Sequence, residues 1–176
     1  MKTKSIALAL LSTILLINSI NVISLANSTP TGIAALWHFD EGIDSAAADS
    51  SGNSNTGTLS GGKFGNALYF DGISDYVEIP HSSSLSIFST GITLEAWINA
   101  EEIPASGLRD LIVSKTHAYA LQVSDGGKVR VYLGALSPYH QTASIVVSTN
   151  TRHHVATSWD ESHVRARGDE FVFLTT

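Results

Sequence analysis

Oxygen-bearing side chains in two polar loops are the residues of this chain best suited to chemistry. They are Asp49, Asn53, Asn55, Asp71 and Asp75. Calcium takes six to eight oxygen ligands from carboxylates, amides, backbone carbonyls and water, usually in flexible loops. The five residues are therefore candidate calcium ligands. A second interpretation stays open, because Asp and Asn also stabilise turns by hydrogen-bonding their own backbone.

The histidines do not form a pattern typical of zinc. His153 and His154 are adjacent on an expected strand, and His163 follows ten residues after the first of them. A zinc metalloprotease would instead carry His-Glu-x-x-His on a helix. Adjacent strand residues face opposite sides of a sheet, so the pair cannot easily bind one ion. We expect structural roles for these histidines.

Aromatic side chains are candidates for ligand contact, because a flat ring packs against the apolar face of a sugar. The three tryptophans lie among apolar strand residues, which favours core packing for each. They are Trp37, Trp97 and Trp159. The tyrosines of a later hairpin and of the loop after it are better placed to bind a ligand. They are Tyr119, Tyr132 and Tyr139.

The elements that must position these residues are short strands. Runs of alternating apolar and polar residues are separated by Gly, Ser, Asn and Asp, and no segment keeps a helical period for three turns. The expected strands are 34–39, 67–70, 76–79, 93–99, 111–114, 118–123, 129–133, 144–147 and 153–158. Many short strands at this spacing predict an all-β chain folded as an antiparallel two-sheet sandwich or jelly roll.

Two connections carry specific expectations. Asp125-Gly126-Gly127 offers residues that accept positive φ, so it predicts a hairpin between 118–123 and 129–133. The segment 50–62 is rich in Ser, Gly, Asn and Thr, and we expect an ordered loop there. A flexible linker is the alternative that its composition leaves open.

Five segments of the chain form a pattern together. The first is the expected hairpin of Gly65–Gly72 and Asp75–Ile79, two strands joined by an acidic, Gly-containing turn. The others are Ala35–Gly42, Asp49–Thr58, Ile92–Ile98 and His153–Ala156. In this order they resemble the laminin-G-like jelly-roll domains of the concanavalin A-like lectin and glucanase superfamily. The resemblance covers about residues 33–160, and it implies a jelly roll that often holds calcium.

The sequence lacks the catalytic patterns that enzymes of this fold use, so we do not expect an enzyme. Glucanases of this fold use a Glu-x-Asp-x-Glu cluster, which brings two carboxyl groups close together for retaining hydrolysis. That cluster is absent here, and Glu95 stands alone between Leu94 and Ala96. Arg109, Tyr139, His140 and Gln141 contain the residue types of a polysaccharide lyase without its arrangement.

The first residues indicate export. Lys2 and Lys4 precede an apolar run over 6–17, which is shorter than the roughly 20 residues of a membrane span. Ser24-Leu25-Ala26 has the small residues of a cleavage site, so we expect a signal peptide over 1–26 and a mature chain without a membrane span. An uncleaved anchor is the alternative. The expected location is extracellular or at the cell surface.

Composition limits the partners of the mature chain. The sequence has 16 Asp and Glu against 10 Lys and Arg, a net charge of −6, and no cysteine. Disulfides are therefore excluded, and nucleic acid is not an expected partner because no basic stretch interleaved with aromatics occurs after the signal. The expected partner is a carbohydrate or a cell-surface glycoconjugate.

The end of the sequence does not follow the pattern of the resembled family. The family continues after its His-His-Val-Ala strand with a Tyr-x-Asp-Gly hairpin and a closing Ile-Asp-x-Val strand, and neither occurs here. We expect a truncation or frameshift after Arg165, which gives a partial domain over 27–165 and an atypical tail over 166–176. The alternative is that 171–174 forms a replacement strand. Arg167-Gly168-Asp169 matches an integrin-binding tripeptide by chance.

These observations predict a secreted, non-catalytic module that binds carbohydrate or another surface ligand with the help of calcium. Two other functions stay open. One is an accessory fragment of a secreted glycoside hydrolase or polysaccharide lyase. The other is a structural adhesion or protein-interaction domain without affinity for sugar.

Overall fold

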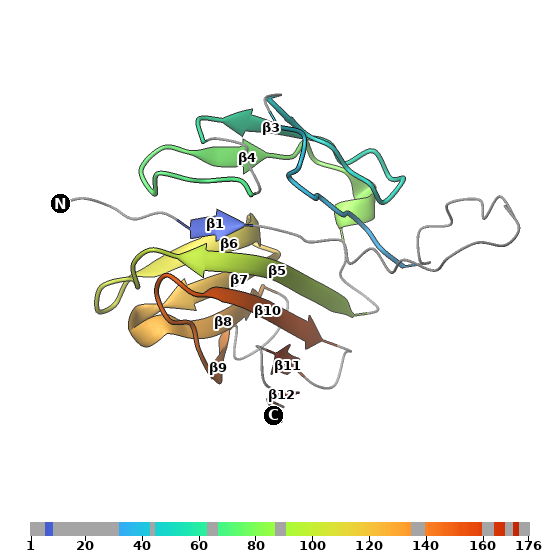
Figure 1. Ribbon diagram of the computed structural model, residues 1–176. Coiled ribbons are helices and arrows are strands. Elements are labelled where there is room, and N and C mark those ends of the chain that lie inside the picture. Colours follow the sequence, from blue (N-terminus) through green and yellow to red (C-terminus); the bar gives the residue numbers. More distant parts are fainter. Residues whose placement is uncertain are drawn as a thin grey trace, which may run out of the picture.

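Antiparallel β-strands form almost all the regular structure of the described chain (Figure 1). The computed structural model describes residues 6–8, 32–42, 45–62, 67–86, 91–134, 140–159, 164–167 and 171–172. Its only helical elements in these ranges are two single turns of 3-10 helix, η1 (Ser83–Leu85) and η2 (Asp125–Gly127). The all-β fold expected from the sequence is confirmed.

The strands form three sheets. A five-stranded sheet has the order β1 (Ile6–Leu8), β5 (Ile92–Ala100), β10 (Arg152–Trp159), β11 (Val164–Arg167) and β12 (Phe171–Val172). A four-stranded sheet has the order β6 (Arg109–Lys115), β7 (Tyr119–Ser124), β8 (Lys128–Leu133) and β9 (His140–Val146). A small third sheet consists of β2 (Ala46–Ala47), β3 (Gly57–Ser60) and β4 (Tyr76–Glu78).

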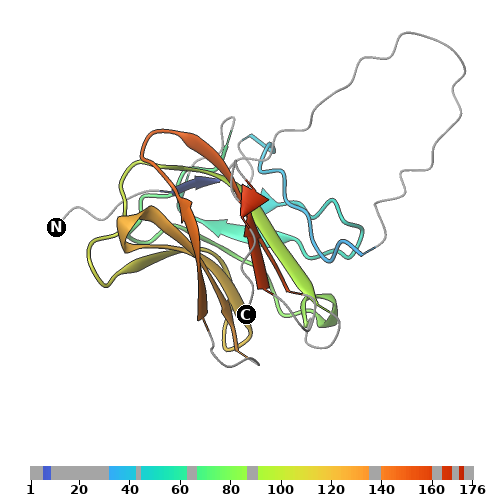
Figure 2. The same ribbon diagram turned by 90° about the horizontal axis from the view of Figure 1, so that it is seen from below.

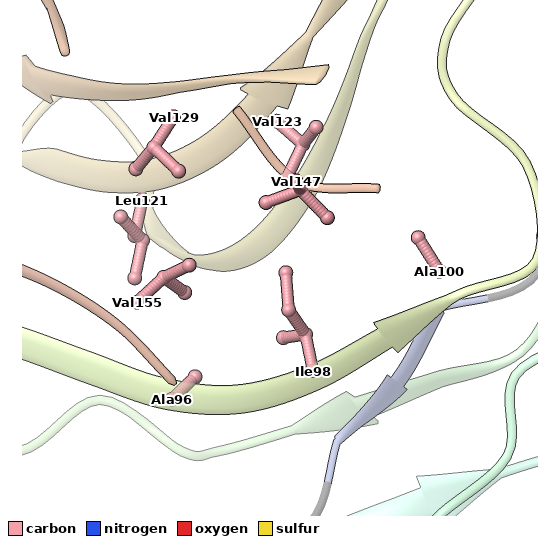
Figure 3. Close-up of a cluster of buried hydrophobic side chains, with 8 residues drawn as sticks. All are labelled: Ala96, Ile98, Ala100, Leu121, Val123, Val129, Val147 and Val155. Carbon is pink, nitrogen blue, oxygen red and sulfur yellow. The ribbon is translucent and has the colours of Figure 1, made fainter. Parts of the chain in front are cut away.

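The main core lies between the five-stranded and the four-stranded sheet (Figure 2). Alternate residues of each strand point inward, because successive side chains of a strand leave opposite faces. Figure 3 shows these side chains pointing toward one another from the two sheets. They are Ala96, Ile98, Ala100, Leu121, Val123, Val129, Val147 and Val155. The arrangement is the two-layer sandwich that the sequence predicts.

Two smaller clusters extend this core. One continues between the same two sheets and includes Ile92, Tyr119, Val131 and Val164, with Trp159 packed against it. The other belongs to the three-stranded sheet, where Phe39, Ala47 and Leu68 are buried and Trp37 packs against them. Core packing is therefore confirmed for two of the three tryptophans.

The hairpin of β7 and β8 forms as predicted. Gly126 and Gly127 have φ of 70° and 75°, a region that L side chains rarely adopt. The turn aligns Leu121 with Val131 and Gln122 with Arg130. This register fixes which residues share each face of the four-stranded sheet.

The N-terminal third differs from expectation. Residues 57–60 form strand β3 in the segment expected to be a loop, and β4 pairs with β3. Of the expected strand 67–70, residues 68 and 69 are single bridge residues. The expected strand 34–39 contributes only an isolated bridge between Trp37 and Asp49. Alternation alone could not find β3, because Gly57-Thr58-Leu59-Ser60 contains a single large apolar residue.

The chain termini carry short strands. β1 lies within the expected signal peptide and pairs with the Ile98–Ala100 end of β5. β12 pairs with β11 at residues 171–172, within the tail expected to be atypical. The domain boundaries expected from the sequence stay predictions.

Candidate ligand-binding site

The Asp49 loop is held together by its own hydrogen bonds. Asp49 Oδ1 accepts from the backbone N–H groups of Leu36 (2.9 Å) and Ser51 (2.9 Å). Its Oδ2 accepts from the Asn55 N–H (2.8 Å) and the Ser51 hydroxyl (2.8 Å). Partial burial would raise the pKa of Asp49, but the three N–H groups together with the hydroxyl hold it below its usual value. The carboxylate thus ties residue 36 to the loop.

The two asparagines of this loop serve the same purpose. Asn55 is buried, and its amide donates to Ala34 O (2.8 Å) and Ser84 Oγ (2.9 Å). Asn53 Nδ2 donates to Ile33 O (2.9 Å). Both side chains direct their donors at protein oxygens, whereas a cation needs their acceptors.

The Asp71 turn is closed in a similar way. Asp71 Oδ1 accepts from the backbone N–H groups of Ile73 (2.8 Å), Ser74 (2.9 Å) and Asp75 (3.2 Å). Its own N–H donates to Asp75 Oδ2 (2.8 Å). The bonds from Ser74 and Ile73 lower the pKa of Asp71. These are the contacts expected of a turn-capping carboxylate.

The five predicted calcium ligands do not come together. Gly57, at the start of β3, pairs with Ala47 beside the Asp49 loop, and Ser60, at its end, pairs with Tyr76 beside the Asp71 turn. The two groups therefore lie at opposite ends of β3. In the part of the chain that the structure describes, no three His, Asp or Glu side chains are grouped to hold a metal ion. As placed, these residues fit turn capping and do not fit one shared calcium site, so calcium binding stays a prediction.

The predicted ligand-binding tyrosines have different positions. Tyr119 points into the core and its hydroxyl donates to Leu85 O (3.1 Å), and its burial raises the pKa of the phenol. The structure therefore corrects the interpretation of Tyr119 as a ligand contact. Tyr132 is half-buried on the opposite face of the four-stranded sheet, opposite Ala120 of β7. Tyr139 lies outside the described residues.

The face of the four-stranded sheet that carries Tyr132 also holds an unusual polar pair. Gln122 of β7 and Arg130 of β8 are direct cross-strand partners, and both alternate with core residues. Gln122 is 6 % exposed. Its Oε1 and the Nε of Arg130 are both buried, and neither has a hydrogen-bond partner among the described residues. Among the side chains that the structure describes, two complementary polar atoms thus have no partner on the face turned away from the core.

The pairing register continues this face across all four strands. Leu111 of β6 lies opposite Gln122, and Thr142 of β9 lies opposite Arg130. Leu111 is 57 % exposed, which places an apolar side chain beside the polar pair. One row across the strands therefore contains an apolar side chain (Leu111), an acceptor (Gln122) and a donor (Arg130) side by side. We call Leu111, Gln122, Arg130 and Tyr132 the Gln122 face.

The outer face of the five-stranded sheet carries a second group of side chains. Trp97 of β5 packs between Arg152 and His154 of β10, with the Arg152 Cζ 4.4 Å from the centre of the indole ring and the His154 ring centre 5.0 Å away. His154 Nε2 is 3.7 Å from Glu95 Oε2. The interpretation of Trp97 as a core residue was therefore wrong, because β5 turns its odd-numbered residues outward. His153 faces the other side of the sheet, because adjacent residues of a strand point to opposite sides. Its Nε2 accepts a hydrogen bond from the backbone N–H of Ser148.

Sequence reasoning missed most of these residues. Gln122 and Arg130 belong to different strands, and only the hairpin register brings them together. The signal available in the sequence was the polar Gln122 in the middle of the otherwise apolar strand 119–123, at the position where an alternating strand turns outward.

Comparison with known families decides the classification. The family model of the concanavalin A-like lectin/glucanases superfamily matches residues 70–167. The chain belongs to this superfamily. The match spans β4 to β11, and so includes the four-stranded sheet and the strands β5, β10 and β11 of the five-stranded sheet. Searches of the curated proteins and of the solved structures found no match.

Membership in the superfamily supports a carbohydrate- or ligand-binding module in general. Its laminin-G-like members commonly bind carbohydrates or proteins and are typically extracellular, although the superfamily also includes glucanases. Among the helices of the described residues, none has the length and apolar character to cross a membrane.

Proposed function

We propose that the chain is an exported, non-catalytic module that binds a neutral polysaccharide on the Gln122 face. The observation that carries this proposal is a pair of buried atoms on adjacent strands, Gln122 Oε1 and Arg130 Nε, that have no hydrogen-bond partner within the described part of the chain. The basic, apolar leader sequence supports export. The missing acidic cluster supports the absence of catalysis.

An unpaired polar atom destabilises a folded protein. Burying a donor or acceptor without a partner costs about 1–3 kcal/mol. Native proteins therefore contain few such atoms, and each calls for a water, an ion or a ligand that completes its bonding. Two of them side by side on a surface-facing row, as here, favour a bound partner over chance.

A sugar hydroxyl has the chemistry that this pair lacks. One hydroxyl group can donate its hydrogen to Gln122 Oε1 while it accepts from the N–H of Arg130 Nε. Leu111 lies in the same row and supplies apolar surface for the C–H groups of a pyranose, and the partly exposed Tyr132 lies on the same face. Alternation of polar and apolar contact is typical of small-molecule recognition.

Access to the pair requires a small movement. Both atoms are covered by neighbouring side chains, and Arg130 itself is half-buried and long. Arg side chains lie along protein surfaces with flexible stems, so rotation of Arg130 away from Gln122 would admit a hydroxyl between them. Because neither atom has a hydrogen-bond partner among the described residues, binding would not break a hydrogen bond that these two atoms make there.

The test uses Gln122→Leu, which keeps the size of the side chain and removes both polar atoms. If Gln122 is kept for a ligand, this variant should raise the free energy of unfolding by about 1 kcal/mol, because an unpaired buried oxygen disappears. Affinity for a neutral polysaccharide identified on a glycan array should fall about tenfold or more. Isothermal titration calorimetry and urea denaturation measure the two effects.

Asn99→Leu is the matched control, since Asn99 carries an exposed amide on β5, which belongs to the other large sheet. It should change neither quantity. A Gln122→Leu variant that binds as well as the wild type would exclude this site. A folded chain that binds no glycan but recovers proteins from cell surfaces would favour the adhesion function, and turnover of a polysaccharide would favour the hydrolase or lyase fragment.

A further inference from the structure

Two Asp-Gly pairs occur in the sequence, and both lie in turns that the structure describes. Asp71-Gly72 begins the turn before β4, and Asp125-Gly126 lies in η2, between β7 and β8. Such a pair can react without an enzyme, because glycine has no side chain to shield its backbone nitrogen from the preceding carboxyl group. In a folded chain the rate depends on how the turn holds that carboxyl group.

The reaction is a ring closure within the pair. The backbone nitrogen of glycine attacks Cγ of the aspartic acid, a C–N bond forms, the nitrogen loses its proton, and one water molecule leaves. The product is a cyclic imide. Water then opens the ring at either carbonyl group, which restores aspartate or gives isoaspartate, in which the main chain runs through Cγ. Water is the only other reactant, and the isoaspartyl chain has the mass of the original.

The Asp71 turn opposes this reaction. Oδ1 of Asp71 accepts from the backbone N–H groups of Ile73, Ser74 and Asp75. Ring closure turns the carboxylate into a neutral carbonyl group of a ring that includes the Gly72 nitrogen, so these bonds must be broken or weakened. The bonds from Ser74 and Ile73 also lower the pKa of Asp71. The group therefore stays ionised, and a carboxylate is a poorer electrophile than the neutral acid.

The Asp125 turn holds its carboxylate less. Among the residues that the structure describes, one N–H group donates to this carboxylate, that of Gly107, which lies 3.1 Å from Oδ2. Asp125 and Gly126 are both exposed, and a Cβ at Gly126 would meet no atom within 4 Å. The turn therefore leaves room for the ring and gives water access to it.

We propose that Asp125 is a modification site at which isoaspartate forms in the folded chain, whereas the Asp71 turn protects Asp71. The chemistry requires no ligand, so it goes beyond the proposed binding of carbohydrate. Isoaspartate adds one methylene group to the main chain between β7 and β8. The hairpin turn then no longer has the length that places Gln122 opposite Arg130. An aged chain should therefore be less stable than a fresh one.

Ageing of the full chain in heavy-oxygen water tests the proposal. Each ring opening leaves one heavy oxygen in the product, and later digestion with trypsin in ordinary water separates the two pairs. The peptide 64–109 contains Asp71, and the peptide 116–128 contains Asp125 as its only aspartate. At neutral pH, Asp125 should take up label at least about tenfold faster than Asp71. Fragment ions in mass spectrometry assign the labelled residue.

The matched control is the same chain in concentrated urea. The turns are lost there, so the two residues should take up label at similar rates. Two results would overturn the proposal. One is equal labelling of Asp125 and Asp71 in the folded chain. The other is labelling of both residues in urea and of neither in the folded chain, which would show that the fold protects both turns.

The variant Asp125→Glu connects the label with stability. Its longer side chain cannot close the same ring, so its urea midpoint should not change with age. The midpoint of the wild type should fall as label enters Asp125. An equal fall in the two chains would assign the loss of stability to another residue and would contradict the proposed effect on the hairpin.

Discussion

At the scale of single residues, the carboxylate of Asp49 organises the N-terminal loops. Its four short hydrogen bonds reach Leu36, Ser51 and Asn55, and Asn55 carries the connection on to Ser84. These segments have little regular secondary structure, so side-chain bonds replace the strand ladder that fixes the rest of the chain. Removal of the carboxylate charge should therefore lower the stability of the folded chain.

Asp49→Asn should lower the free energy of unfolding by about 1–3 kcal/mol. The amide has one acceptor oxygen instead of two, and its NH₂ group faces N–H and O–H donors. Urea denaturation measures the change. Asp40→Asn is the control, because Asp40 is exposed in the same region and should change stability little. Equal stability of the wild type and Asp49→Asn would show that the loop bonds are dispensable.

The same carboxylate predicts a pH dependence. The pKa of Asp49 is lowered from its ordinary value of 3.8, so the ionised form is favoured in the folded chain. Its contribution to stability is fully present above that ordinary value and is lost as the pH falls through the lower folded pKa. The urea midpoint of the wild type should therefore fall more steeply below about pH 4 than that of Asp49→Asn, although Asp71, with a lowered pKa as well, contributes to both. Parallel curves would contradict this account.

Calcium binding can be tested at the same residues. Asp49 accepts from four donors with its two oxygens and Asp71 accepts from three with one, so a calcium ion at either residue must compete with these hydrogen bonds. A folded chain that binds no calcium in calorimetry would contradict the prediction from the sequence, and saturable binding would confirm it. Its loss in Asp71→Ala but not in Asp49→Ala would then place the ion at the Asp71 turn.

At the scale of elements, the β7–β8 hairpin sets the register on which the Gln122 face depends. Its two glycines offer a matched pair. A Cβ at Gly127 would collide with the carbonyl oxygen of Val147, whereas one at Gly126 would meet no atom within 4 Å. Both positions have positive φ, so both substitutions share the same conformational cost.

Gly127→Ala should therefore destabilise the chain more than Gly126→Ala does. The shared cost of positive φ is about 1–2 kcal/mol, and the collision at Gly127 adds at least as much again. Urea denaturation of the two variants isolates the collision as their difference. Equal destabilisation would mean that the Val147 carbonyl moves aside freely.

The sequence predicts an element well when the hydrophobic pattern of that element's own residues identifies it, and poorly when contacts distant in sequence determine it. Strands such as 119–124 and 128–133 alternate clearly around a Gly-Gly turn, so element and partner were both predictable. β3 has too few apolar residues to signal a strand, and its pairing with β4 depends on contacts distant in sequence. Which side of each sheet a residue occupies was harder to predict. Trp97 looks like a core residue in the sequence, and only the register of β5 with β10 shows that it lies on the outer face.

At the scale of the whole molecule, the hydrophobic core separates the Gln122 face from the outer face of the five-stranded sheet. Residues on separate sheets that share no partner usually act independently. Arg152→Gln, on the outer face of the five-stranded sheet, should therefore leave affinity for a neutral polysaccharide unchanged. Isothermal titration calorimetry measures this affinity, and a loss as large as that of Gln122→Leu would contradict the separation.

The pairing of β1 with β5 has a consequence for the life of the chain after synthesis. β1 belongs to the expected signal peptide, and it covers the backbone edge of β5 at Ile98–Ala100. Cleavage after Ala26 would remove that cover and leave unpaired N–H and C=O groups beside the core of the sandwich. The precursor and the processed chain would then differ in self-association. The edge of β5 is covered in the precursor, whereas in the processed chain it is free to pair with a strand of another molecule.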